Sequence, residues 1–188
     1  RVPTLFRVHG QPEARKIDLL TTVLGTLGIA ADLPEEPKPR DLRAITEKLG
    51  KRAERGFVES LVVRAMPQAL YQPANIGHFG LALAEYAHFT SPIRRYPDLL
   101  VHRALLAALG EGEEAPGLAE ARDVAADCSA RERESARIER ESDDICAAFL
   151  LERELLEGGW KRTFEGEISG VIGAGAFVTF GGEFGDVY

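Results

Sequence analysis

The chain has 188 residues, of which 45% are hydrophobic and 28% charged, and its net charge is −7. This composition excludes a disordered tail, a collagen-like fibre and a disulfide-bonded scaffold, and the length suits one domain or slightly more than one. Because nucleic-acid coat proteins are usually basic, any RNA site here has to concentrate positive charge locally on an otherwise acidic surface.

The first third of the chain predicts one strand followed by helices. Residues 2–8 alternate in part, which is typical of a short strand. Three segments predict helices because apolar side chains recur at i, i+3 and i+4, and these are residues 13–29, 41–49 and 53–66. Pro67 ends or kinks the third of them.

Residues 70–88 break the helical pattern and are rich in aromatic, glycine and histidine residues, which is typical of a functional surface. Ser91 followed by Pro92 then predicts a helix start, with a hydroxyl N-cap and proline at the first helical position. We expect an early kink or restart of this helix at Pro97 and Asp98, and Gly110 ends it.

Residues 117–157 predict helix in two parts, because Ser129 and Glu132 fit a capping box that would begin a new helix. After residue 160, β-branched and aromatic residues alternate with glycines, which predicts two strands and the start of a third. We therefore expect an α+β protein with a mostly helical part, 1–159, and a β part, 160–188. No run of apolar residues is long enough for a membrane span.

The expected helix start at Ser91 carries Arg94 and Arg95. Free N–H groups and the helix dipole favour an anion at such a position, and two guanidinium groups add a planar fork that fits phosphate. Positive charge continues along the helix, and nearby rings suit stacking on the bases of a single strand. The residues meant are His102 and Arg103 for charge, and His78, Phe79, Tyr86 and His88 for stacking. These features alone leave open an arginine-rich surface helix with its aromatics in the core.

Residues 77–103 hold Gly-His-Phe-Gly-Leu-Ala, then Tyr-Ala-His-Phe-Thr-Ser-Pro-Ile-Arg-Arg-Tyr-Pro-Asp-Leu, then His-Arg. This block resembles the RNB catalytic domain of the ribonuclease II / ribonuclease R family, and its detail is closer to the ribonuclease R branch. The flanking segments also match, at residues 5–9, 64–71 and 128–132. The resemblance covers essentially the whole chain, and it implies the C-terminal part of an RNB domain followed by the beginning of an S1-type OB-fold.

The family resemblance implies a processive, hydrolytic 3′→5′ exoribonuclease that degrades single-stranded RNA to nucleoside 5′-monophosphates. It implies Mg²⁺ as cofactor, bound by an aspartate cluster upstream of residue 1, so that this segment alone is expected to be inactive and to hold no metal ligands. We also expect a cytoplasmic monomer with no membrane partner. The rival interpretation is a non-catalytic RNB-like regulator that binds RNA, and a helical interaction module without RNA is a third.

The resemblance implies roles for particular residues. Arg94 matches the arginine that contacts the phosphate at the scissile end of the RNA, and Arg95 an RNA-backbone or structural contact. Glu139 matches a glutamate near the bound 3′ nucleotide, although a solvated, charge-rich helix stays open for it. Phe177 and Tyr188 match stacking positions of the S1-type hairpin.

For several other residues the sequence favours a structural role or leaves one open. Ala174 replaces the usual first aromatic of the S1-type hairpin, which leaves open that the hairpin is only a scaffold. Adjacent helical carboxylates at Asp143 and Asp144 cannot point the same way, so we expect them to be structural. Cys128 and Cys146 lack metal-ligand spacing, and we expect both to be small buried apolar residues.

Overall fold

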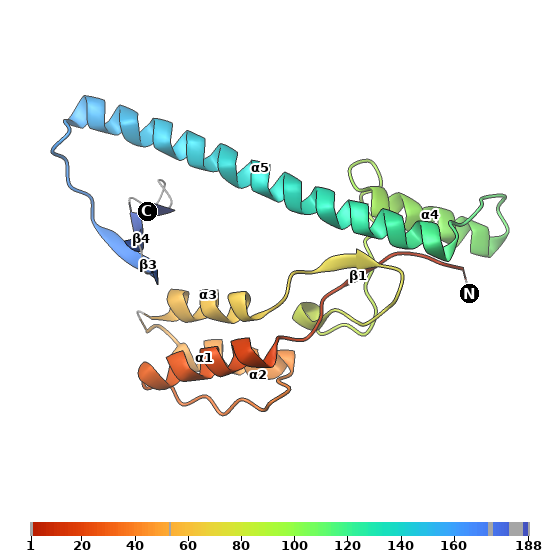
Figure 1. Cartoon of the computed structure of the whole chain (residues 1–188), viewed down its shortest axis with the longest axis horizontal. Coiled ribbons are helices and arrows are strands. Elements are labelled where there is room, and N and C mark those ends of the chain that lie inside the picture. The colour runs from red at the N-terminus through yellow and green to blue at the C-terminus, as the bar shows by residue number, and fades with distance from the viewer. Residues whose placement is uncertain (1, 53, 173–174, 181–185, 188) are drawn as a thin grey trace. The chain divides into compact units, whose positions relative to one another are not determined.

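The computed structural model describes residues 2–52, 54–172, 175–180 and 186–187 (Figure 1). The chain forms two compact units, Arg1–Ala130 and Arg131–Tyr188. Helix α5 (Leu118–Gly158) contributes its first residues to one unit and the rest to the other.

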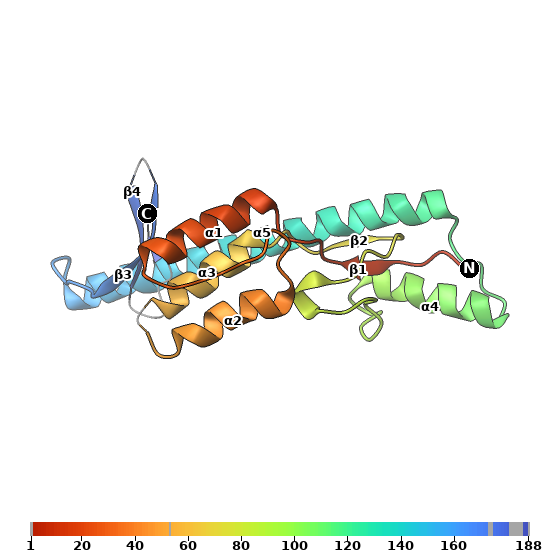
Figure 2. The ribbon, with the colours of Figure 1, turned by 90° about the horizontal axis from the view of Figure 1, so that it is seen from below.

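Three helices form one part of the first unit, namely α1 (Ala14–Thr26), α2 (Pro39–Leu49) and α3 (Arg55–Ala65). Figure 2 shows α3 between α1 and α2, and it packs against both. Their shared core is apolar, and α1 supplies the fully buried Leu24 to it. The three helices predicted from the periodicity of apolar residues are therefore confirmed, each within a few residues at its ends.

A small antiparallel sheet forms the other part of the first unit. Strand β1 (Phe6–Val8) pairs with β2 (Leu70–Gln72), and Arg7 lies opposite Tyr71. A second buried cluster combines Leu5, which precedes β1, and Tyr71 of β2 with residues of α4 (Tyr96–Leu109) and α5. Its buried members are Leu5, Tyr71, Leu100, Ala121 and Ala125. The strand predicted at residues 2–8 is thus real but shorter.

Helix α5 is a single helix of 41 residues, so the new start predicted at Ser129 is wrong. The hydroxyl of Ser129 is buried and has two partners: it donates to the carbonyl oxygen of Ala125 at 2.8 Å and accepts the backbone N–H of Tyr71 at 2.9 Å. It therefore cannot cap a new helix. The helix also contains no glycine or proline before Gly158 that would interrupt its hydrogen bonds.

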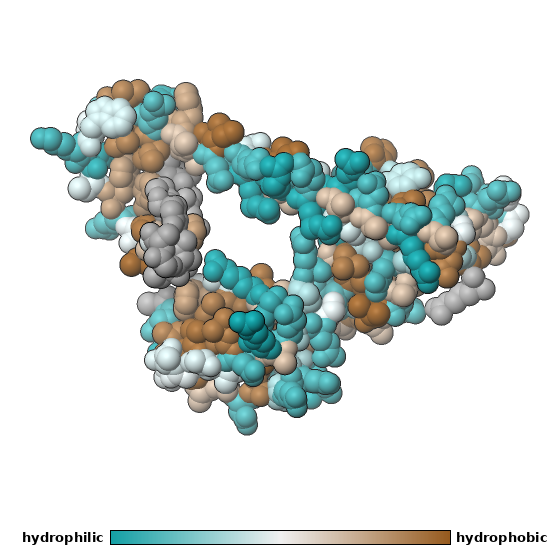
Figure 3. Space-filling view, viewed as in Figure 1, coloured by the Kyte–Doolittle hydropathy of each residue, from teal (hydrophilic) through white to brown (hydrophobic). Residues whose placement is uncertain are grey.

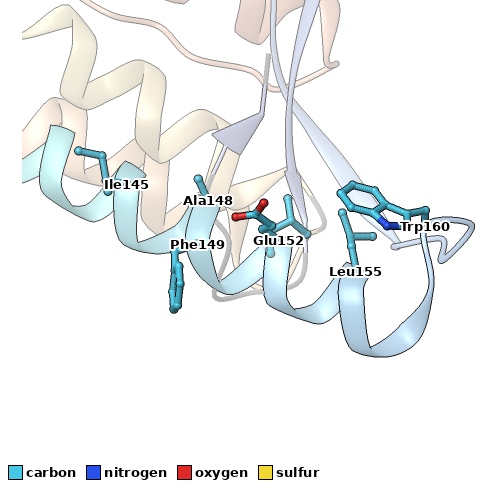
Figure 4. A pocket seen from close by; sticks show the side chains of 7 residues that line it. Ile145, Ala148, Phe149, Glu152, Leu155 and Trp160 are labelled. Carbon is cyan, nitrogen blue, oxygen red and sulfur yellow. The ribbon is translucent and has the colours of Figure 1, made fainter.

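The second unit consists of the remainder of α5 and an antiparallel sheet of β3 (Gly166–Ile172), β4 (Gly175–Phe180) and β5 (Asp186–Val187). The last turns of α5 and Trp160 line an open apolar groove of about 570 Å³ (Figure 4). Apolar side chains gather around this end of α5 in Figure 3. Phe149 and Trp160 line the groove and are 63% and 69% exposed.

The α+β class and the mostly helical first part are confirmed. The assignment of the strands to an S1-type OB-fold, and the domain boundary between residues 159 and 160, stay predictions. The prediction that both cysteines are buried is wrong for Cys146, which is exposed, whereas Cys128 is half-buried beside the second cluster. None of the helices in the described ranges combines the length and the apolar character of a membrane span.

Candidate phosphate and RNA-binding site

The segment before α4 is a turn, and Arg94 lies at its end. The backbone N–H groups of Arg94 and Arg95 both donate to the carbonyl oxygen of Ser91, at 3.2 and 3.0 Å. Helix α4 begins only at Tyr96, with Arg95 as its N-cap in an extended conformation. The predicted helix start at Ser91 is therefore wrong, and the two arginines precede the helix instead of lying in its first turn.

Asp98 explains why the helix starts late. Its side chain is fully buried in the first turn of α4, and one carboxylate oxygen, Oδ1, accepts two hydrogen bonds. The donors are the backbone N–H of Ser91, at 2.8 Å, and Nη2 of Arg95, at 2.9 Å. A buried carboxylate has to be paired, and a helix N-terminus favours negative charge. The turn is thus folded back onto α4 by Asp98, and Pro97 is the proline that starts the helix.

The two arginines consequently have different surroundings. Arg95 is half-buried, with 24% of its side chain exposed, and its charge is paired with Asp98. Arg94 is exposed and makes no ion pair with any residue that the structure describes. Its guanidinium is therefore available to an external anion.

A chain of aromatic and histidine rings lies in the same unit. The ring of Tyr86 meets His78 and His88 edge to face, with centroids 5.3 and 5.7 Å apart. The hydroxyl of Tyr71 is 2.8 Å from Nδ1 of His88. His9 stacks on His78 with centroids 5.1 Å apart, and also on Phe79 at 6.2 Å. The four rings proposed for base stacking from the sequence thus do lie together.

Sequence reasoning assigned no role to His9 and Tyr71, which complete this chain of rings. Both belong to short segments that match the family pattern, residues 5–9 and 64–71, and that match was the signal that could have identified them. Both are buried, His9 with 8% and Tyr71 with 5% exposed. The ring of His9 stacks on the half-buried His78, and the ring of Tyr71 meets the half-buried His88 edge to face with centroids 5.5 Å apart.

Backbone hydrogen bonds fix the loop that carries these rings. His78 and Leu83 exchange two backbone hydrogen bonds of 2.8 and 3.2 Å, and the Phe79 N–H donates to the carbonyl oxygen of His9 at 2.9 Å. Gly77 has a φ of +79°, and a Cβ there would lie 3.2 Å from the carbonyl oxygen of Leu83. Gly77 therefore allows the tight turn that the loop needs.

Two histidines of the loop region are held neutral. Nδ1 of His9 accepts the N–H of Gly80 at 3.1 Å, and Nδ1 of His78 accepts the N–H of Leu81 at 3.3 Å. Burial lowers the pKa of His9, and the positive charge of Arg7 adds to this effect, while a hydrogen bond to the carbonyl of Pro67 opposes it. Burial also lowers the pKa of His78, together with the neighbouring His9. Both rings thus act as uncharged faces at neutral pH.

His102 and Arg103, which the sequence placed on a basic stripe, have partners inside the protein. Nε2 of His102 is 2.8 Å from the carbonyl oxygen of Phe89, and the two rings stack with centroids 4.0 Å apart and planes 2° apart. Arg103 pairs with Glu113 at 3.4 Å and donates to the carbonyl oxygen of Glu114 at 3.2 Å.

The remaining predicted residues belong to the second unit or lie outside the described ranges. Glu139 is exposed on α5 and has no ion pair there, whereas its neighbours Glu134 and Glu141 both pair with Arg137. Phe177 is half-buried on β4 and lies opposite Gly170 of β3. Tyr188 and Ala174 lie outside the described residues.

The acidic, histidine and cysteine side chains of the described residues are dispersed. Among the described residues, no three His, Cys, Asp or Glu side chains lie close enough together to hold a metal ion. The paired carboxylates Asp143 and Asp144 are exposed on α5 and are part of no such group. The described residues therefore do not fit an Mg²⁺ site.

Comparison with known proteins gives a family match. The model of the RNB domain matches residues 1–111. A ribonuclease R from Aquifex aeolicus is 41% identical over 179 residues, which cover 94% of this chain and 24% of that protein. The chain thus spans about a quarter of the length of this curated relative.

Two solved structures share the fold. Mycoplasma genitalium RNase R in complex with ribose-methylated single-stranded RNA superposes with a TM-score of 0.88 at 24% identity, over 98% of this chain and 29% of that one. The structure of yeast Ssd1, described as a pseudonuclease, has a TM-score of 0.59 at 28% identity, over 66% of this chain and 16% of that one.

Proposed function

The chain belongs to the RNB-domain family, and we propose that it is the phosphate-handling part of a processive, hydrolytic 3′→5′ exoribonuclease acting on single-stranded RNA. The observation that carries the proposal is the exposed guanidinium of Arg94, which pairs with none of the described acidic residues and lies on a turn that Asp98 holds through the N–H of Ser91. The similarity to ribonuclease R supports the exoribonuclease activity, and the RNA complex of a protein with this fold supports RNA as the ligand.

In this proposal Arg94 binds the phosphate at the scissile 3′ end and orients it. A guanidinium can donate two parallel hydrogen bonds to phosphate oxygens, which fixes the direction of the group as well as its position. Negative charge that develops on those oxygens during hydrolysis is stabilised by the same cation. Arg95 contributes less charge to the RNA because Asp98 compensates it, so its main role is to hold the turn.

The rings of His78, Phe79, Tyr86 and His88 would supply the stacking surface for bases. Stacking tolerates any base, which suits an enzyme that degrades RNA regardless of its sequence. Because burial keeps His78 neutral, this surface would hold bases mainly by stacking, and phosphate binding would depend on Arg94. Glu139 near the 3′ nucleotide and Phe177 on the hairpin are the further contacts that we propose.

Metal dependence is a separate part of the proposal. A divalent cation would supply activated water and charge stabilisation in such a hydrolase. The described residues hold no set of ligands for it, so we assign none of the metal chemistry to them. We therefore propose that Mg²⁺ binds upstream of residue 1, that the segment alone does not cleave RNA, and that the products are nucleoside 5′-monophosphates. The cytoplasmic location and the monomeric state also stay predictions.

The experiment uses the complete polypeptide, as wild type, Arg94→Ala and Arg94→Lys, on a 5′-labelled single-stranded RNA with Mg²⁺. We expect a ladder that shortens from the 3′ end and disappears with EDTA. We expect Arg94→Ala to be strongly slowed, and Arg94→Lys to be only partly active because lysine lacks the fork. Equal rates for all three proteins would remove Arg94 from the mechanism.

The second candidate function is an RNA-binding regulator without nuclease activity. The structural similarity to a protein described as a pseudonuclease supports this alternative. The same assay separates the two functions, because tight RNA binding without shortening in the wild type would establish the regulator. Release of 5′-monophosphates, identified by chromatography, would exclude it.

A further inference from the structure

Helix α4 carries two side chains on one face that bind the backbone of the segment leading to Arg94. Asp98 and His102 are four residues apart, so they lie one above the other on the helix. Asp98 accepts the N–H of Ser91 at 2.8 Å, and His102 lies 2.8 Å from the carbonyl oxygen of Phe89. Residues 89–91 are in neither helix nor strand, and these two side chains bind one backbone group at each end of the segment.

The direction of the His102 bond is determined by its partner. A carbonyl oxygen only accepts, so Nε2 of His102 carries the proton and donates. The face of the ring is also occupied, because it lies parallel to the ring of Phe89 with centroids 4.0 Å apart. The Nε2–H group of His102 and one face of its ring are therefore both occupied by Phe89, and neither is available to a ligand.

These contacts determine the position of Arg94. The carbonyl oxygen of Ser91 accepts the N–H groups of both Arg94 and Arg95, so a displaced Ser91 would displace the whole turn. Asp98 also holds Arg95, which leaves Arg94 as the exposed cation of the turn. We propose that Asp98 and His102 are positioning residues that clamp residues 89–91 onto α4 and thereby hold the guanidinium of Arg94 at the scissile phosphate. This inference rests on the proposed function, and it gives His102 a role other than direct contact with RNA.

The ion pair between Arg95 and Asp98 is a second part of the clamp. Nε of Arg95 and Oδ2 of Asp98 are buried, and neither has a hydrogen-bond partner among the described residues. A guanidinium can pair with a carboxylate side-on through Nε and Nη, so the two unsatisfied atoms are complementary. Lysine has no such pair of donors, which makes Arg95→Lys a non-conservative change for the clamp.

The test is a double-mutant cycle on the complete polypeptide, with single-turnover cleavage of a labelled single-stranded RNA as the readout. His102→Phe keeps the ring but removes the donor, whereas His102→Gln keeps a donor near the position of Nε2. If the clamp acts through Arg94, His102→Phe slows cleavage between about tenfold and a hundredfold, which is the range for a misplaced catalytic group. His102→Gln restores most of that rate, and His102→Phe has no further effect in an Arg94→Ala background.

Several outcomes would overturn the clamp. Additive effects of the two changes would mean that His102 contacts the RNA itself, as would a loss of RNA affinity with an unchanged cleavage rate of the bound RNA. If His102→Phe does not fold, Asp98→Asn replaces it in the cycle, because it keeps an acceptor for Ser91 but weakens the pair with Arg95. If the wild type binds RNA without cleaving it, the proposed function fails, and the same cycle measured on RNA affinity decides the clamp.

Discussion

The hydroxyl of Ser129 accepts the backbone N–H of Tyr71 at 2.9 Å and so ties strand β2 to helix α5 across 58 residues of sequence. Ser129→Ala would leave this buried N–H without its partner, which costs about 1–3 kcal/mol. We expect the free energy of unfolding of the chain, from urea denaturation, to fall by that amount. Ser142→Ala is the matched control, because its hydroxyl also donates to a carbonyl four residues earlier but is exposed. An equal effect of both changes would show that only helix propensity is being measured.

Arg94→Ala should change how RNA binding depends on salt. Each phosphate contact that is lost lowers the slope of log affinity against log salt by about 0.7 for a single strand. We expect that change for Arg94→Ala and none for Arg15→Ala, since Arg15 is an exposed residue of α1 and is proposed for no RNA contact. Titration of a labelled single-stranded RNA at several salt concentrations, without divalent cations, gives the slopes. Unchanged slopes for both variants would contradict a phosphate contact of Arg94.

Acid should loosen the loop of residues 77–83. The pKa values of His9 and His78 are lowered from 6.5, so their neutral forms stabilise the folded state. This stabilisation is complete above pH 6.5 and is lost as the pH falls from there through the lower folded pKa values. His78→Asn keeps an acceptor for Leu81 but does not titrate, so we expect a flatter decline of stability over this pH range. Thermal unfolding of both proteins at a series of pH values provides the comparison, and superimposable profiles would contradict the prediction.

Gly166 should tolerate no side chain. A Cβ there would lie 2.7 Å from Cγ1 of Val178 and 3.1 Å from Cβ of Phe180, on the neighbouring strand β4. We expect Gly166→Ala to weaken the pairing of β3 with β4, with faster amide exchange along both strands. Gly56→Ala on α3 is the control, because no atom lies within 4 Å of its Cβ position and alanine suits a helix better than glycine. Unchanged exchange in Gly166→Ala would mean that the strands can shift to admit a methyl group.

Local patterns predicted the parts of the fold that local physics controls. Helices α1, α2 and α3 follow from the spacing of apolar residues, and the strands after residue 160 follow from β-branched residues and glycines. The start of α4 did not follow, because a buried carboxylate seven residues after Ser91 decides it. The helix start predicted at Ser129 was wrong for the same reason. Its hydroxyl binds the backbone of β2, which is distant in sequence, and caps no helix.

The candidate site was predictable in its residues but less so in their roles. The sequence indicated both arginines of the turn. It could not show that Arg95 pairs with Asp98 while Arg94 has no such partner in the part of the chain that the structure describes, because nothing in the sequence marks Asp98 as buried. It indicated the rings of the loop but not the buried His9 and Tyr71 beneath them. The stacking of His102 on Phe89 depends on how the chain folds back onto α4, and no spacing rule describes that.

The single tryptophan of these 188 residues, Trp160, lines the groove at the end of α5 in the second unit, whereas Tyr71, Tyr86 and Tyr96 all belong to the first unit. Three of the four tyrosines therefore belong to the first unit, and the fourth, Tyr188, belongs to the second unit with Trp160. Selective excitation of Trp160 follows the second unit alone, and a blue shift of its emission would show that something has covered the groove. Tyrosine emission comes mostly from the first unit, where a base stacked on Tyr86 would quench part of it.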